Sequence, residues 1–121
     1  MKFEYIYGKE SQEYDYLYIP KAFMKDERYK TMSATAKILY ALLLEKQQQS
    51  AKMGWIDENN HAYIMMEVEE LGKELNWDVT NTVAAIQELE DIGLLELEGL
   101  QDAASVDSAI THRKVYLKRF V

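Results

Sequence analysis

The sequence predicts a single α+β domain, and three patterns along its 121 residues support this fold class. Apolar residues alternate with polar ones near both ends of the chain, as they do in strands with one buried face. The middle of the chain has helical periodicity instead, over residues 33–48 and 67–92. The length leaves room for one hydrophobic core, so residues 1–121 are expected to form one domain.

The first element expected is a β-hairpin over residues 2–19. Aromatic residues alternate with polar ones on both sides of a polar break, and Pro20 ends the second strand because it offers no N–H group to a strand ladder. Cross-strand packing of the rings is the simplest use of this pattern; a dimer interface and base stacking are the alternatives. The alternating residues are Phe3, Tyr5, Tyr7, Tyr14, Tyr16 and Tyr18.

A central helix is expected over residues 33–48, followed by a second hairpin over residues 54–66. Ser33 is a suitable N-cap, and the run from Ile38 to Leu44 is apolar around most of the helix circumference, which indicates a helix surrounded by protein. Two short β-prone runs flank the Asn-rich turn at residues 58–61, which is typical of a hairpin.

A short helix and a longer helix are expected over residues 67–92, joined by a tight turn. Asp78 is the expected N-cap of the second helix and Gly93 its C-terminal cap. On a helical wheel, Val79, Val83 and Ile86 point toward the core. The wheel places on the opposite side Thr80, Asn81, Ala84, Ala85, Glu88 and Asp91.

Two more strands and a polar loop are expected over residues 94–120. The order helix, turn, helix, strand, loop, strand is that of a winged helix-turn-helix, whose second helix enters the major groove of DNA and whose strand pair forms the wing. Small and polar side chains on the second helix could approach a groove and bond to bases, and cations of the wing could hold phosphates. The candidate DNA-binding residues are Thr80, Asn81, Thr82, Ala84, Gln87, His112, Arg113 and Lys114.

From about Tyr14 onward the chain resembles the RepA_N family, the N-terminal domain of replication initiator A proteins from plasmids of Gram-positive bacteria. The resemblance covers more than four fifths of the chain, in several blocks that follow one another in order. These blocks are residues 18–23, 29–33, 36–44, 54–59, 68–71, 88–90, 93–95 and 115–118.

The resemblance implies a dimeric winged-helix domain that binds repeated sites of double-stranded DNA in a plasmid origin and starts replication. Initiators of the family carry a further C-terminal domain, so the resemblance also implies that this chain is either the DNA-binding part alone or a short stand-alone relative. The family places lysines along the recognition helix and a basic turn in the wing. Here the helix has Val79, Ala84 and Gln87, and the loop at residues 99–107 is acidic.

The charge distribution gives the strongest reason to consider another function. The formal net charge is −7, and residues 67–99 hold ten acids against one base, so that segment carries −9 and the remainder +2. Phosphate neutralisation provides much of the affinity for DNA, and an acidic helix-turn-helix would repel the phosphates instead. DNA binding then requires cations of the wing and of residues 21–30, with a contribution from the free N–H groups at the start of the second helix. The alternatives are an acidic protein-interaction module or DNA mimic that docks on a basic partner through residues 67–99, and a small transcriptional regulator.

Other function classes find little support in the sequence. The longest apolar run is far shorter than the ~20 residues of a membrane helix, no apolar leader precedes residue 16, and cysteine is absent, so we expect a cytoplasmic protein with no membrane association. His61 and His112 lack the spacing of metal ligands, and the carboxylates between residues 67 and 74 are expected to be solvated. No phosphate-binding loop or nucleophile motif occurs, so no enzymatic activity, metal or cofactor is expected.

Overall fold

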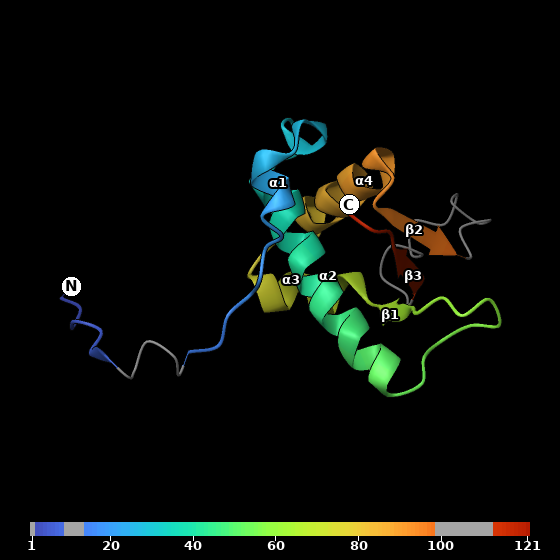
Figure 1. The fold of residues 1–121 in the computed structure, drawn as a ribbon, viewed down its shortest axis with the longest axis horizontal. Helices are drawn as coiled ribbons and strands as arrows, with labels where there is room; N and C mark the ends of the chain where they lie inside the picture. Colours follow the sequence, from blue (N-terminus) through green and yellow to red (C-terminus); the bar gives the residue numbers. More distant parts are fainter. Residues whose placement is uncertain (1, 9–13, 99–112) are drawn as a thin grey trace.

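The computed structural model describes residues 2–8, 14–98 and 113–121. It contains a mixed arrangement of helices and one small antiparallel sheet, which makes the domain α+β (Figure 1). In chain order the elements are α1 (Ala22–Lys25), the 3-10 helix η2 (Glu27–Tyr29), α2 (Ala34–Lys52), β1 (Ile64–Met66), α3 (Val68–Leu75), α4 (Val79–Ile92), β2 (Leu95–Glu98) and β3 (Arg113–Leu117).

The central helix α2 begins where its sequence predicts and ends four residues later than expected. The hydroxyl oxygen of Ser33 accepts a hydrogen bond from the N–H of Ala36 at 3.1 Å, which satisfies one of the free donors of the first turn. Leu39 and Leu43 are fully buried, so α2 is the element around which the others pack.

An aromatic cluster joins the segment before α2 to the end of the chain. The ring of Phe23 lies 4.9 Å from that of Tyr29, 5.0 Å from that of Tyr40 and 5.8 Å from that of Phe120, in edge-to-face geometries. The hydroxyl of Tyr40 donates to the carbonyl of Lys118 at 2.7 Å, and that of Tyr29 to the carbonyl of Phe120. Burial raises the pKa of Tyr40 to about 12, so the phenol remains a donor at neutral pH.

The sheet has the order β1-β3-β2, with β3 antiparallel to both neighbours. Val115 of β3 lies opposite Ile64 of β1 and Leu97 of β2. Ile64, Leu95 and Val115 are buried against the helices, so one face of the sheet completes the core. The predicted strands within residues 94–120 are thus present, while the loop between them, 99–112, lies outside the described residues.

Two hairpin predictions need correction. Residues 2–8 and 14–20 form no strand, and the aromatic rings there are exposed; an isolated two-stranded ribbon with no covering layer is marginally stable. Within 54–66, a tight turn closed by the Ile56–Ala62 bridge does form. The run from Ile64 to Met66, however, pairs with β3, because its alternate side chains are buried in the core.

The turn between α3 and α4 brings the two helices very close together. Asn76 ends α3 with a φ of 58°, a left-handed conformation that asparagine tolerates. A Cβ atom on Gly72 would lie 2.9 Å from the carbonyl oxygen of Trp77 and 3.1 Å from the hydroxyl of Thr82. Glycine at position 72 therefore permits this approach.

No helix in the parts of the chain that the structure describes is long and apolar enough to cross a membrane.

Replacing Gly72 with alanine is expected to destabilise the domain, because the added methyl group meets backbone that cannot move without separating α3 from α4. We expect a loss of about 1–3 kcal/mol in the free energy of unfolding, as for other overpacked sites. Urea denaturation measures it. Gly8→Ala is the control, since its Cβ atom would meet nothing within 4 Å. Equal stability of the two variants would contradict the close approach.

Candidate nucleic-acid interface

The helix α4 exposes a side chain pattern suited to contact with another molecule. Its buried side comprises Thr82, Ala85, Ile86 and Leu89, which pack against the rest of the core. The exposed side, which we call the outer face of α4, consists of Thr80, Val83, Ala84, Gln87 and Asp91, with Val79 at its edge beside the buried side. Asn81 is exposed at the margin of this face. Four of the candidate residues, Thr80, Asn81, Ala84 and Gln87, are therefore accessible.

Thr82, a fifth candidate, is wrongly placed by the sequence pattern. Its side chain is 0% exposed, and its hydroxyl donates to the carbonyl of Asp78 at 2.8 Å. Ala85 was expected to point outward and is buried, whereas Val79 and Val83 were expected inside and are 44% and 37% exposed. The buried side of α4 is rotated by roughly 80° about the helix axis from the side that carries Val79 and Val83.

Contacts from neighbouring helices account for this rotation. Gly72 of α3 admits the hydroxyl of Thr82, so position 82 must face inward. Glu88 was expected to point to solvent, yet its carboxylate accepts hydrogen bonds from both the N–H and the hydroxyl of Ser33, at 2.7 Å each. A carboxylate is favourable there because the start of α2 carries a partial positive charge.

The start of α4 is already occupied by a carboxylate. One oxygen of Asp78 accepts from the N–H of Asn81 at 2.7 Å. The expectation that free N–H groups over residues 79–81 would bind a phosphate is therefore wrong for Asn81. Asp78 also places a negative charge at this end of the helix, which opposes a phosphate rather than attracting one.

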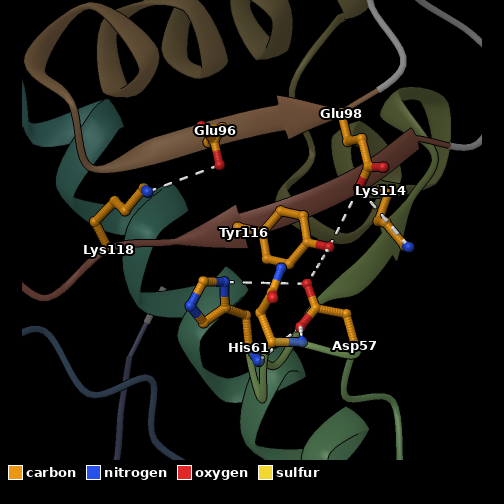
Figure 2. A network of polar contacts seen from close by, with 8 residues as sticks. Asp57, His61, Glu96, Glu98, Lys114, Tyr116 and Lys118 are labelled. Carbon is orange, nitrogen blue, oxygen red and sulfur yellow. Dashed lines mark hydrogen bonds and ion pairs between the residues drawn. The ribbon is translucent and has the colours of Figure 1, made fainter.

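The outer face of the sheet holds its cations in contacts within the domain (Figure 2). The ammonium group of Lys114 lies 3.7 Å from the carboxylate of Glu98 and 4.4 Å from the centre of the Tyr63 ring. That of Lys118 lies 3.7 Å from the carboxylate of Glu96. The predicted phosphate ligand Lys114 is thus paired.

The other predicted cations of this region are less defined. Arg113 pairs with Met66 through its backbone, and nothing is described of its side chain. His112 lies outside the described residues. Of the expected phosphate contacts before α2, Arg28 and Lys30 pair with neighbouring acids. Hydrogen bonds from Arg28 lower the pKa of Asp26 to about 2.

Lys21 and Lys25, at the beginning and end of α1, are exposed and form no ion pair with another described residue. They are accordingly available for phosphate contacts, which sequence analysis had assigned to them. No group of three or more His, Cys, Asp or Glu residues in the described ranges could hold a metal ion.

A hollow of about 840 Å³ lies between the 57–61 turn and the outer face of the sheet, and sequence analysis did not identify it. The phenol of Tyr116 points at two carboxylates, 2.9 Å from Asp57 and 3.2 Å from Glu98 (Figure 2). Asp57 also accepts the N–H groups of Asn59 and His61, at 2.9 Å each. The backbone N–H of His61 and the Tyr116 phenol lower the pKa of Asp57, while burial and the two carboxylates raise that of Tyr116.

This network fastens the turn to β3, and its chemistry is that of an acidic surface. Three of the four carboxylates that line the hollow, Asp57, Glu96 and Glu98, take part in the contacts drawn in Figure 2. The signal in the sequence was present but short: an aspartate followed by Asn59, Asn60 and His61 is typical of a turn whose side chain bonds to the backbone two residues on.

Much of the acidity of residues 67–99 has a structural use. Five of the ten acids contact a base or a helix start. Three of them pair with lysines: Glu74 with Lys46, Glu98 with Lys114 and Glu96 with Lys118. The other two lie at helix starts, because Glu88 binds the start of α2 and Asp78 caps α4. The net charge of −9 in the sequence therefore overstates the charge that this segment presents to a partner.

Replacing Tyr116 with phenylalanine is expected to raise the pKa of Asp57, because the ionised carboxylate loses a donor. Because the pKa of Asp57 is lower in the folded protein than in the unfolded one, its ionised form stabilises the fold at pH values above the unfolded pKa, and this contribution is lost as the pH falls. The variant therefore has a smaller free energy of unfolding than the wild type at neutral pH. The ¹³C shift of the carboxyl carbon measures the change. Tyr63→Phe is the control, and an unchanged titration in Tyr116→Phe would contradict the network.

Comparisons with known proteins identify the family of this chain. A family model described as the N-terminus of replication initiator protein A matches residues 15–121. No curated protein sequence matches the chain. Several solved structures resemble it. Among them are one titled as the N-terminal domain of a DNA-binding protein, with 26% identity and a TM-score of 0.74, and one titled as a Rep-DNA complex, with 28% identity and a TM-score of 0.73. Another is titled as an MDR initiator, with 27% identity and a TM-score of 0.72. The first match covers 99% of this chain and 86% of the other, the second 98% and 85%, and the third 96% and 86%. The chain belongs to the family of replication initiator protein A N-terminal domains.

Proposed function

We propose that this domain is a winged helix-turn-helix that binds double-stranded DNA at repeated sites of a plasmid replication origin. The observation that carries the proposal is the exposed outer face of α4, which presents small and polar side chains beside a single acid, Asp91, and is packed on α2 and α3. In this proposal α3 and α4 are the helix-turn-helix, α4 enters the major groove, and β2 and β3 form the wing. The similarity to a structure titled as a Rep-DNA complex supports it.

Phosphate contacts in this proposal come from few residues. Lys21 and Lys25 are exposed and without an ion pair among the described residues, and we assign further contacts to His112, Arg113 and Lys114. Lys114 must exchange Glu98 for a phosphate oxygen. Because the slope of affinity against salt concentration reflects the number of neutralised phosphates, we expect a shallow salt dependence. The proposed role is binding alone, in the cytoplasm, with no catalytic step.

A homodimer is part of the proposal, and the aromatic residues of the N-terminal segment are its proposed contact surface. Phe3, Tyr5 and Tyr7 are 82%, 84% and 64% exposed, and residues 2–8 extend away from the helices in Figure 1. At roughly 150–250 Å² per aromatic ring, two such segments would bury about 900–1,500 Å² against each other's domain, close to a standard interface. A hollow of about 360 Å³ lined by Tyr16, Tyr18, Ala41 and Leu44 among its residues is a suitable acceptor on the partner.

The acidic surface favours one other function, docking on a basic protein. Glu69, Glu70 and Asp91 are exposed and lie on the two helices proposed to meet DNA. A partner with a basic face would match them, as a DNA mimic does. We consider this the second candidate because half of the acids of residues 67–99 are held in contacts within the domain. A transcriptional regulator would use the same DNA-binding surface at an operator.

Gln87→Ala is expected to weaken binding to the direct repeats of the source replicon about 10-fold, since an amide that bonds a base edge contributes about 1–3 kcal/mol of discrimination. Asn81→Ala and Arg113→Ala are expected to weaken it as well. Fluorescence anisotropy at ~50 mM salt, where electrostatic attraction is strongest, measures the affinity. Gln49→Ala makes the same change at an exposed position of α2 and should bind normally.

If the wild-type chain binds no repeat DNA at that salt concentration, origin binding is wrong for this protein. Capture of a basic protein that charge-reversing substitutions at Glu69 and Glu70 abolish would then favour the second candidate. Normal binding by Gln87→Ala together with weak binding by Gln49→Ala would show that the interface lies on another face.

Replacing Phe3, Tyr5 and Tyr7 with serine is expected to shift the chain from dimer to monomer, because each arm loses the apolar area that it contributes to its partner. Sedimentation velocity across a concentration series measures the dissociation constant. The control replaces Lys2 and Glu4 in the same segment with serine and should remain dimeric. A wild-type chain that sediments as a monomer at all concentrations would exclude the arm as a dimer contact.

A further inference from the structure

The outer face of α4 has few hydrogen-bonding groups for a surface that reads bases. Val79, Val83 and Ala84 are exposed on it, which leaves the hydroxyl of Thr80, the amide of Gln87 and the carboxylate of Asp91 as its polar groups. The sequence of α4 contains no Lys, Arg or His. The bidentate contact from Arg or Lys to guanine, the commonest specific contact in the major groove, therefore cannot come from this helix.

The major groove offers one apolar group to such a surface, the 5-methyl group of thymine. Glutamine is the complement of adenine, because its amide can donate to N7 and accept from N6. In this structure Asp91 accepts from the Gln87 amide nitrogen at 3.2 Å, which uses one of its two protons and leaves the other proton and the carbonyl oxygen for a base.

The spacing along the helix suits consecutive contacts with one DNA strand. Val79, Val83 and Gln87 are four residues apart, and each step of four advances about 6 Å along the helix axis. Two base steps advance roughly 7 Å along a strand. Each of these positions on a helix lying along the groove would therefore contact a different base, and the contacted bases would be about two base steps apart.

We propose that α4 selects A·T base pairs, with Val79 and Val83 packed against thymine methyl groups and Gln87 bonded to an adenine. This inference rests on the proposed DNA-binding function and names the class of site that it takes. Discrimination comes from methyl contacts and one amide, and the acidic residues around the helix penalise non-specific approach of phosphates.

The test begins with a pool of random-sequence duplexes, from which the chain selects its tightest site at ~50 mM salt. That duplex is then synthesised again with deoxyuridine for thymidine, a change that removes only the methyl groups. We expect a selected core of A·T pairs and a loss of about fourfold in affinity for each contacted methyl group.

Val83→Thr replaces one methyl group of the side chain with a hydroxyl of similar size, so the ratio of thymine to uracil affinity should fall toward one. Ile92→Thr is the matched control, since Ile92 is also exposed on α4, at 41%, but outside the outer face, and it should keep the wild-type ratio. Thermal unfolding confirms that both variants fold.

A selected core of G·C pairs, or equal wild-type affinity for the two duplexes, would overturn the assignment of thymine contacts while leaving DNA binding intact. A chain that retains no duplex from the pool would instead refute the proposed function, and this inference with it. Loss of the thymine preference in Ile92→Thr but not in Val83→Thr would place the methyl contacts elsewhere on the helix.

Discussion

The rotation of α4 about its own axis is the constraint on which the candidate interface depends. It is fixed at one end by Thr82, which fits against Gly72, and at the other by Glu88, which binds the start of α2. Thr82 lies on the buried side of the helix and Glu88 on its flank, so these contacts fix the outer face without occupying it. A rotation of one residue would bury Val79 and expose Ala85, and the chemistry offered to a partner would change completely.

Contacts of this kind also reduce the negative charge that residues 67–99 present to a partner. A carboxylate at a helix start or beside a lysine is neutralised locally, and five acids of residues 67–99 are used in this way. As a result, Lys114 of β3 and Lys118, which follows the strand, are occupied as well. In the part of the chain that the structure describes, Lys114 and Lys118 and half of the acids of residues 67–99 are thus held in contacts within the domain.

Features set by short-range chemistry could be predicted from the sequence, and those set by distant contacts could not. Ser33, Asp78 and Gly93 mark helix ends because capping depends on a residue and its near neighbours, and each lies where it was expected. The rotation of α4 depends on Gly72 and Ser33, which belong to other elements. The alternating aromatic residues near the N-terminus indicated a strand, but a strand also needs a partner, and none of the described residues provides one.

A weakly basic interface has a consequence for how the proposed DNA binding would work. Non-specific affinity arises from phosphate neutralisation, so a domain whose proposed interface has few free cations spends little time on arbitrary sequences. Its specific affinity is limited for the same reason, since base contacts add to that electrostatic term rather than replace it. Linking two domains restores affinity without adding charge, because the second contact becomes intramolecular at a high effective concentration. On the proposed function, dimerisation and the repetition of sites in an origin are therefore what such an interface needs in order to bind at all.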